Sequence, residues 1–327
     1  MGEEVDRTGT LVPDGRQDVP IPKVGVLAIQ GAFVEHSVQL RHLGADVIEV
    51  RLPEHFNDLD GIIIPGGEST AMALIGERWG VFPRLKSWVN DGRPTWGTCA
   101  GMILLSDHAL MTKQGGQSLV GGLDVEVCRN YFGAQSSSFE IPLDTALLNL
   151  GAGSQSVTAK EYKPYPAVFI RAPAILEVIY KAAGPGVDVL CKVRARPCNK
   201  ARSSMQAILQ EGKILGEADE CSSNGEVQSE EERSAKRRKL LEFFSEPPTD
   251  GLARGGQAGM MEKESGELPE VIVAVQKGNI LATAFHPELT DDARWHQHFM
   301  TMVQGYQAKA RGAPVEAPVS DVKISSA

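Results

Sequence analysis

One cysteine of this 327-residue chain stands in a sequence that could make it a nucleophile. Cys99 lies between Gly97 and Gly101, after the short apolar run 94–96 and before the helix-like run 100–105. A strand, a sharp turn and a helix in this order form a nucleophile elbow, from which the side chain projects. The glycines permit the turn, and the start of the helix favours a thiolate. The alternative is a buried, unreactive cysteine.

A histidine and a glutamate two residues apart could complete this chemistry. His286 and Glu288 follow a predicted strand and are separated by Pro287, which fixes φ. If the segment is extended, both side chains lie on one side of the chain. An imidazole beside a carboxylate is the orienting pair of a nucleophile–base–acid triad, so we expect Cys99, His286 and Glu288 to act together. A structural histidine at the end of a strand is the alternative.

A glycine-rich segment, residues 65–70 (PGGEST), is the third candidate. It follows the apolar run 61–64. Two glycines permit backbone N–H groups to point at a developing oxyanion. An ordinary turn between a strand and a helix has the same composition.

These residues need an α/β framework to position them. The first half of the chain predicts strands over 23–29, 47–50, 61–64 and before Cys99, and helices over 33–43, from Ala71 with Ser69 or Thr70 as cap, and over 82–89. Their alternation predicts a mostly parallel open sheet flanked by helices. Ligands of such sheets bind beyond the carboxyl ends of the strands, where Gly31, Gly67 and Cys99 lie.

Shorter alternating runs follow residue 121 and predict an antiparallel extension of the sheet. The predicted strands lie over 122–127, 139–141, 167–170 and 187–193, and a hairpin over 271–276 and 280–285 leads to His286. A last helix should start at a Thr290 or Asp291 cap and end near Ala310. Its inner face carries Trp295, Phe299, Met302 and Val303.

The pattern predicts one domain over residues 21–311, with disordered tails at 1–20 and 312–327. Residues 195–269 are rich in Gly, Ser and charged runs and predict a long disordered insertion that loops away from the site. The basic run 236–239 could be a nuclear localisation signal, although a solvated charge cluster is the simpler interpretation.

Composition limits the partners and the compartment. A net charge of −9 and 6% aromatic residues argue against a nucleic-acid partner. The five cysteines include no C-x-x-C pair, which argues for free thiols in a reducing compartment and against a zinc site. No apolar run approaches membrane-spanning length, and the acidic N-terminus resembles no signal peptide. We therefore expect a cytoplasmic protein without a membrane partner.

Taken together, the motifs resemble the class I, triad-type glutamine amidotransferases, and within that class the glutaminase subunits of pyridoxal 5'-phosphate synthases. The segments that carry the resemblance are 30–32 with 35–36, 65–70, 97–101, 129–133, 138–140, 169–173 and 281–290. Several of them are longer than the motifs shared by the whole class. One departure is Ala134, where the family usually has arginine.

The resemblance implies a role for each matching residue. Cys99 would be the nucleophile, His286 the general base and acid, and Glu288 the carboxylate that orients it. Glutamine would be held by Gly67, Glu68, Ser69, Arg129, Ile170 and Arg171, and the backbone N–H groups of Gly67 and Ala100 would form the oxyanion hole. An arginine fork suits the α-carboxylate of glutamine, whereas surface salt bridges are the alternative for the two arginines.

The resemblance also implies an activity and a partner. The chain would hydrolyse L-glutamine to L-glutamate and ammonia, with no cofactor or metal of its own. The ammonia would pass to a separate (β/α)8 synthase subunit that builds pyridoxal 5'-phosphate. Two alternatives stay open, namely the glutaminase of another amidotransferase and a non-catalytic or regulatory binding subunit with the same fold.

Overall fold

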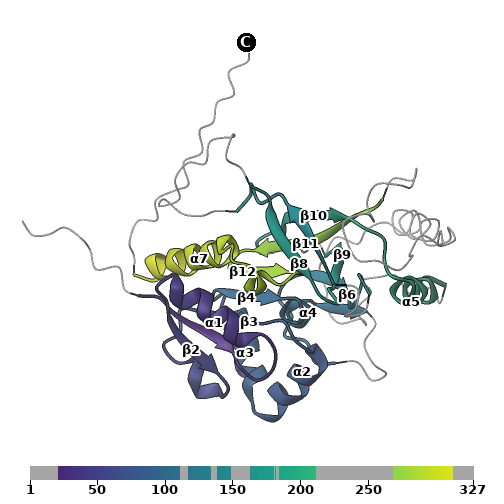
Figure 1. The fold of residues 1–327 in the computed structure, drawn as a ribbon. Helices are drawn as coiled ribbons and strands as arrows, with labels where there is room; N and C mark the ends of the chain where they lie inside the picture. The colour runs from purple at the N-terminus through teal and green to yellow at the C-terminus, as the bar shows by residue number, and fades with distance from the viewer. Residues whose placement is uncertain are drawn as a thin grey trace, which may run out of the picture.

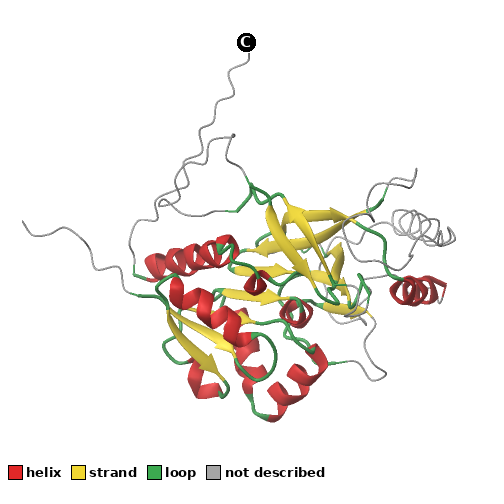
Figure 2. Cartoon of the chain, viewed as in Figure 1, coloured by secondary structure: helices red, strands yellow, loops and turns green. Residues whose placement is uncertain are grey.

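The computed structural model describes residues 21–110, 117–133, 138–148, 163–179, 181, 184–210 and 268–311. These residues form a ten-stranded sheet flanked by helices, together with a separate two-stranded sheet (Figures 1 and 2). The strands are β1 (Lys23–Leu27), β2 (Asp46–Val50), β3 (Gly61–Ile64), β4 (Thr95–Thr98), β5 (His108–Leu110), β6 (Val125–Cys128), β7 (Phe139–Leu143), β8 (Tyr165–Phe169), β9 (Ala174–Val178), β10 (Asp188–Arg194), β11 (Glu270–Lys277) and β12 (Ile280–Thr283). The helices are α1 (Phe33–His42), α2 (Ser69–Arg78), α3 (Val81–Asn90), α4 (Ala100–Leu105), α5 (Asn199–Gln210) and α7 (Arg294–Ala310), with 3-10 turns η1 (Pro53–Phe56) and η3 (Pro287–Leu289).

Five strands form the parallel part of the large sheet, in the order β2-β1-β3-β4-β12. Every residue of β3, β4 and β12 is buried, as expected for strands that are covered on both faces. Because parallel strands end at the same edge, the loops after β1, β3, β4 and β12 meet there. These loops carry Gly31, Gly67, Cys99 and His286.

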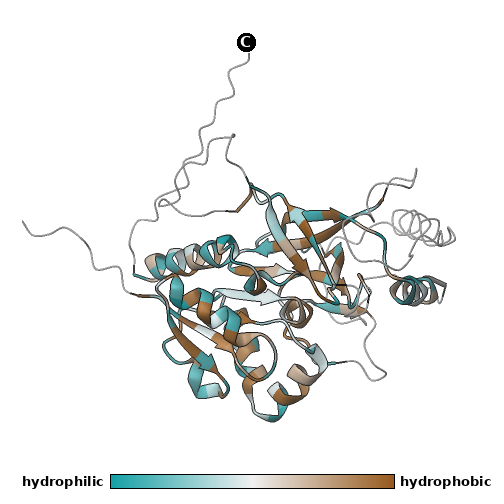
Figure 3. Ribbon diagram, in the orientation of Figure 1, coloured by the Kyte–Doolittle hydropathy of each residue, from teal (hydrophilic) through white to brown (hydrophobic). Residues whose placement is uncertain are grey.

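The two faces of the sheet are covered by different helices. Trp96 of β4 faces α1 and α7, where its ring contacts His36 and Phe299 with centroid distances of 5.5 and 5.7 Å. Gly97 faces the opposite side, where an added Cβ would lie 2.5 Å from the backbone of Gly101 in α4. Figure 3 shows hydrophilic residues along much of α1 and α7, while α7 buries Trp295 and neighbouring apolar side chains.

Beyond these five strands, β6, β9, β10 and β11 form the antiparallel extension that the sequence predicted, and β5 pairs parallel with β6 at the edge of the sheet. β11 pairs antiparallel with β12, β10 and β9, and β6 continues the sheet from β9. The separate sheet consists of β7 and β8. Two strands were missing from the prediction. β5 has only three residues, and β9 follows a proline, so neither has a long alternating pattern.

Two predicted helix caps are wrong. α2 is capped by Glu68, whose carboxylate accepts hydrogen bonds from the backbone N–H groups of Thr70 (3.4 Å) and Ala71 (2.8 Å). α7 begins after Ala293 and has no side-chain cap, and the carboxylate before it, Asp292, accepts hydrogen bonds from the N–H and the guanidinium of Arg294. In both cases the spacing of the residues does not determine which side chain bonds the backbone N–H groups at the start of the helix.

The predicted insertion begins inside the packed domain. Of residues 195–269, the structure describes 195–210 and 268–269, and 199–210 form α5. Ala201 and Met205 of α5 are fully buried, and the N–H of Cys198 bonds the carbonyl oxygen of Tyr131 at 2.8 Å. The rest of the insertion, with the basic run 236–239, and both predicted tails lie outside the described residues. No helix in the described ranges is long and apolar enough to cross a membrane.

Candidate active site

Cys99 occupies the sharp turn between β4 and α4. Its φ of 46° and ψ of −98° place it in a conformation that non-glycine residues rarely adopt. The turn is tight because Gly101 lies against β3, where an added Cβ would be 2.0 Å from the carbonyl oxygen of Ile64. The glycines around Cys99 thus permit the close approach of α4 to the sheet, and the strained nucleophile position follows from it.

His286 and Glu288 form a buried pair at the end of β12. His286 Nδ1 lies 2.7 Å from Glu288 Oε1, and the two residues are 7% and 5% exposed. The extended conformation predicted for this segment is wrong, because residues 287–289 form the 3-10 turn η3. Proline at the first position of the turn supplies the required φ, and the turn brings the carboxylate back to the imidazole.

Cys99 and His286 both lie against Gly66 of the loop after β3, so the thiol and the imidazole are neighbours. Because Nδ1 is engaged by Glu288, Nε2 is the nitrogen left for the sulfur. Burial disfavours the imidazolium, but the interactions with Cys99 and Glu288 outweigh burial and raise the pKa of His286 above its ordinary value. The geometry suits an imidazole that takes a proton from the thiol and keeps it next to the sulfur.

The glycine-rich segment after β3 lies directly against this pair. A Cβ on Gly66 would be 2.5 Å from His286 Cε1 and 3.5 Å from Cys99 Cβ. The carbonyl oxygen of Gly66 accepts a 3.0 Å hydrogen bond from the N–H of Ala32. In a trans peptide the next N–H points the opposite way, so the N–H of Gly67 is directed away from the loop after β1.

The residues predicted to hold glutamine form a second group. Glu68 Oε1 lies 3.4 Å from Arg129 Nη2, which also donates to Thr70 Oγ1 at 3.3 Å. Backbone hydrogen bonds from Ala71 and Thr70, together with Arg129, outweigh the effect of burial and lower the pKa of Glu68. The hydroxyl of Ser69 donates to Gln117 Oε1 at 3.2 Å.

Ile170 and Arg171 are placed differently from one another. The carbonyl oxygen of Ile170 faces the Cys99 thiol at 3.9 Å. Arg171 is exposed, with a φ of 47°, and within the described ranges no hydrogen bond or ion pair links it to Glu68 or Arg129. Ala134 lies outside the described residues.

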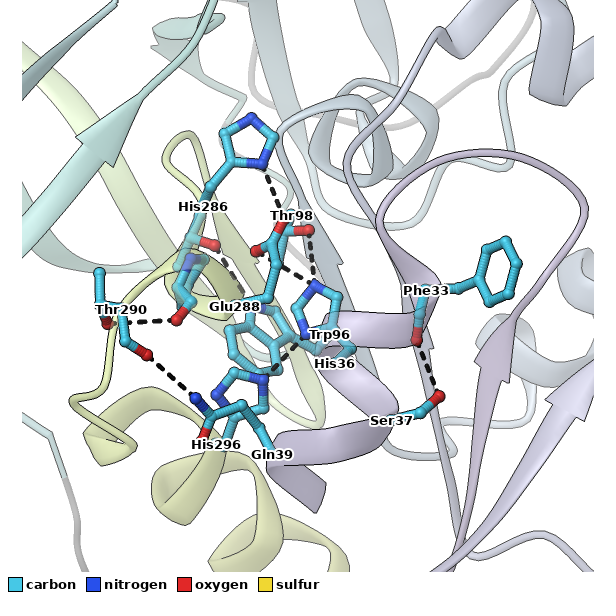
Figure 4. A network of polar contacts seen from close by, with 12 residues as sticks. Phe33, His36, Ser37, Gln39, Trp96, Thr98, His286, Glu288, Thr290 and His296 are labelled. Atoms are coloured by element: carbon cyan, nitrogen blue, oxygen red, sulfur yellow. Dashed lines mark hydrogen bonds and ion pairs between the residues drawn. The ribbon is translucent and has the colours of Figure 1, made fainter. Parts of the chain in front are cut away.

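Three polar residues near the site had no predicted role. Gln30 Oε1 accepts the N–H of Glu68 at 2.8 Å, and Gln117 contacts the hydroxyls of Ser69 and Thr70. His36 contacts the carboxylate oxygen of Glu288 that His286 does not contact (Figure 4). Gln30 and His36 belong to a segment that carried the family resemblance, and this resemblance was the sequence signal that could have assigned them to the site. Among the described residues no cluster of His, Cys, Asp or Glu is arranged to hold a metal ion.

Comparisons with known proteins agree with this geometry. Residues 26–194 and 252–305 match the SNO glutamine amidotransferase family. The chain is 39% identical over 299 residues to "Probable pyridoxal 5'-phosphate synthase subunit PDX2" of Arabidopsis thaliana, covering 91% of this chain and 92% of that protein. It is 35% identical over 287 residues to "Pyridoxal 5'-phosphate synthase subunit PdxT" of Arthrobacter sp., covering 86% and 92%. A solved glutamine amidotransferase structure superposes with a TM-score of 0.52 at 28% identity, covering 86% of this chain and 98% of that one.

Proposed function

Because the chain belongs to the SNO glutamine amidotransferase family, we propose that Cys99, His286 and Glu288 hydrolyse L-glutamine to L-glutamate and ammonia. The observation that carries this proposal is the buried group in which Cys99 and His286 lie against the same glycine, Gly66, while His286 Nδ1 lies 2.7 Å from Glu288 Oε1. A thiol, an imidazole and a carboxylate in this order are what acyl transfer from an amide requires.

The first half-reaction removes ammonia. The thiol proton moves to His286, and the sulfur of Cys99 attacks the side-chain carbonyl carbon of glutamine. The resulting oxyanion would be stabilised by the backbone N–H groups of Gly67 and Ala100. His286 then returns its proton to the leaving nitrogen, the C–N bond breaks, and a γ-glutamyl thioester remains on Cys99.

The second half-reaction hydrolyses the thioester. His286 accepts a proton from water, whose oxygen attacks the thioester carbonyl. The C–S bond breaks and glutamate forms, and His286 returns its proton to the leaving sulfur, which regenerates the thiol of Cys99. Glu288 stabilises the imidazolium in both halves because its carboxylate accepts a hydrogen bond from Nδ1–H.

The binding residues predicted from the resemblance stay part of this proposal. The Glu68–Arg129 pair and the neighbouring Ser69 would hold the α-amino and α-carboxylate ends of glutamine, with Gly67, Ile170 and Arg171 completing the site. Arg129 is suited to the carboxylate because its guanidinium can donate in a fork.

The relatives named as pyridoxal 5'-phosphate synthase subunits support a further step. We propose that the ammonia is delivered to a synthase subunit of (β/α)8 type, a separate chain that makes pyridoxal 5'-phosphate. A cytoplasmic location stays a prediction.

Glutamate release from glutamine tests the proposal. It is to be measured with and without a purified synthase subunit, for the wild type, Cys99→Ala and Cys128→Ala. Cys128 is a matched control, since it is fully buried and burial raises the pKa of its thiol to about 12. We expect turnover that depends on the partner, its loss by at least ~10³-fold in Cys99→Ala, and no loss in Cys128→Ala. Equal turnover in wild type and Cys99→Ala would overturn the proposal, and no turnover in any protein would favour a binding subunit.

A further inference from the structure

The carboxylate of Glu288 lies between two imidazoles. Its Oε1 is 2.7 Å from His286 Nδ1, and its Oε2 is 3.3 Å from His36 Nε2 (Figure 4). The side chains of His36 and Glu288 are both 0% exposed. Within the described part of the chain, Oε2 receives no aligned hydrogen bond, and the ion pair found for it is the one with His36.

The His36 ring is fixed by three elements. Nδ1 lies 2.9 Å from His296 Nε2 of α7, and Nε2 lies 3.2 Å from Thr98 Oγ1 of β4. The edge of Trp96 packs against the same ring. Since α1, α7 and β4 all hold the ring, it cannot rotate to compensate for a change at Glu288.

The protonation of this series can be assigned from its surroundings. Burial, followed by the nearby His296 and His286, lowers the pKa of His36 well below its ordinary value, and burial lowers the pKa of His296 to about 3. Both rings are therefore neutral and carry one proton each. His296 Nδ1 is buried without a partner, so its proton is best placed on Nε2, which donates to His36 Nδ1. The proton of His36 then lies on Nε2, between Thr98 Oγ1 and Glu288 Oε2.

We propose that His36 is a positioning residue for the hydrolysis, whose Nε2–H fixes the second oxygen of Glu288 and so keeps the first oxygen on His286. This inference rests on the proposed function, because it assigns Glu288 to the triad. A buried carboxylate oxygen without a nearby N–H dipole would be poorly stabilised. The carboxylate would then turn away, and His286 would lose the partner that raises its pKa.

Two amide substitutions of His36 distinguish the roles of its two ring nitrogens. In His36→Gln the amide can reach the position of Nε2 and still donate toward Glu288. In His36→Asn the shorter amide reaches only the position of Nδ1, toward His296. The matched control is His298→Gln, which changes another buried histidine of α7 whose Nε2 lies 2.8 Å from Gln276 Oε1.

Three measurements are made on each full-length variant. They are kcat and KM for glutamine with the synthase subunit present, the thermal midpoint, and the pH profile of Cys99 alkylation by iodoacetamide, followed by mass spectrometry. The alkylation needs neither glutamine nor the partner, so it reports on the His286–Glu288 pair even if the proposed function fails.

We expect His36→Asn to lower kcat by about 10- to 100-fold, as for other groups that support a catalytic residue, with KM unchanged. The limb of the alkylation profile that reports His286 should move to lower pH. His36→Gln should recover most of both, and His298→Gln should alter neither. Equal losses in the Asn and Gln variants with an unmoved alkylation profile would overturn the proposal and leave His36 as a packing residue.

Discussion

The two sides of the site are held in different ways. The catalytic side, which is the group proposed to carry the hydrolysis (Cys99, His286, Glu288 and His36), is buried, and the side chains of Glu288 and His36 are 0% exposed. The binding side, which is the group around the residues proposed to hold glutamine (Glu68, Thr70, Gln117 and Arg129), is more open, with Glu68 and Arg129 side chains 41% and 11% exposed.

One contact distance differs in the same direction. The His286–Glu288 pair is joined at 2.7 Å, whereas the Arg129 contacts measure 3.3 and 3.4 Å. Burial and this short contact fix the atoms that are proposed to exchange protons, where small displacements are costly. The binding side keeps room to adjust around a substrate. Substitutions on the catalytic side should therefore lower kcat, and those on the binding side should raise KM.

The largest effect in this comparison is expected for Gly66→Ala. The new Cβ would lie 2.5 Å from His286 Cε1, so the imidazole must move away from Cys99 or Glu288. We expect kcat to fall about 10²-fold or more, because a displacement near 1 Å has that effect on aligned groups, while KM changes little. Steady-state kinetics with the synthase subunit present measures both constants.

Gly305→Ala is the control for this substitution. Gly305 lies in α7 with nothing within 4 Å of an added Cβ. Activity should stay unchanged, and stability should rise by about 0.5–1 kcal/mol because alanine is the better helix former. If Gly66→Ala kept the wild-type kcat, the rigidity assigned to the catalytic side would be wrong.

The buried histidines of the catalytic side should also make stability depend on pH. The pKa values of His36 and His296 are lowered in the folded state, so below pH ~6.5 the unfolded chain binds protons that the native chain does not. The free energy of unfolding should fall with decreasing pH, by about 1.4 kcal/mol per pH unit for each histidine. Urea unfolding at pH 7.0, 6.0 and 5.5 measures this slope.

His296→Gln sharpens this prediction, because glutamine does not titrate. Below pH ~6.5 the slope of the free energy of unfolding against pH should decrease by the contribution of one histidine, about 1.4 kcal/mol per pH unit. The contribution of His286 to the free energy of unfolding changes with pH in the opposite direction. Its pKa is raised, so its contribution is complete below pH ~6.5 and is lost as the pH rises through the folded pKa. An unchanged acid slope in His296→Gln would mean that the buried pair is not held neutral.

The sequence predicted the local turns and strands of the catalytic side better than it predicted the contacts between distant residues that hold this side in place. Apolar runs were sufficient for β1, β3 and β4, and the glycines around Cys99 were sufficient for the turn, because both signals are local. The contact between His36 and His296 joins residues 260 positions apart and depends on how α1 and α7 pack on one face of the sheet. No spacing rule encodes such a contact.

The binding side shows a second limit of sequence reasoning. Glu68 was expected only as a substrate contact, yet it also caps α2, and the predicted Ser69 or Thr70 cap is wrong. A glutamate preceding a helix can use its carboxylate in either way, and the packing around Arg129 decides between them. The packed start of the predicted insertion was missed because α5 buries few residues and is preceded by a segment rich in charge and proline.

The smallest effect is expected on the binding side, for Arg129→Ala. Its guanidinium would hold a charged end of glutamine equally in the ground and transition states, and the loss of such binding raises KM without lowering kcat. We expect KM to rise about tenfold, the equivalent of one charge-assisted contact near 1.4 kcal/mol, with kcat within about twofold of wild type. Arg129→Lys should have a KM between those of the wild type and Arg129→Ala, because lysine keeps the charge but cannot donate two parallel hydrogen bonds. Lys192→Ala, which removes the exposed ion pair between Lys192 of β10 and Glu270 of β11, should leave both constants unchanged. A fall in kcat at constant KM in Arg129→Ala would instead place Arg129 with the catalytic side, because only an interaction made in the transition state gives that result.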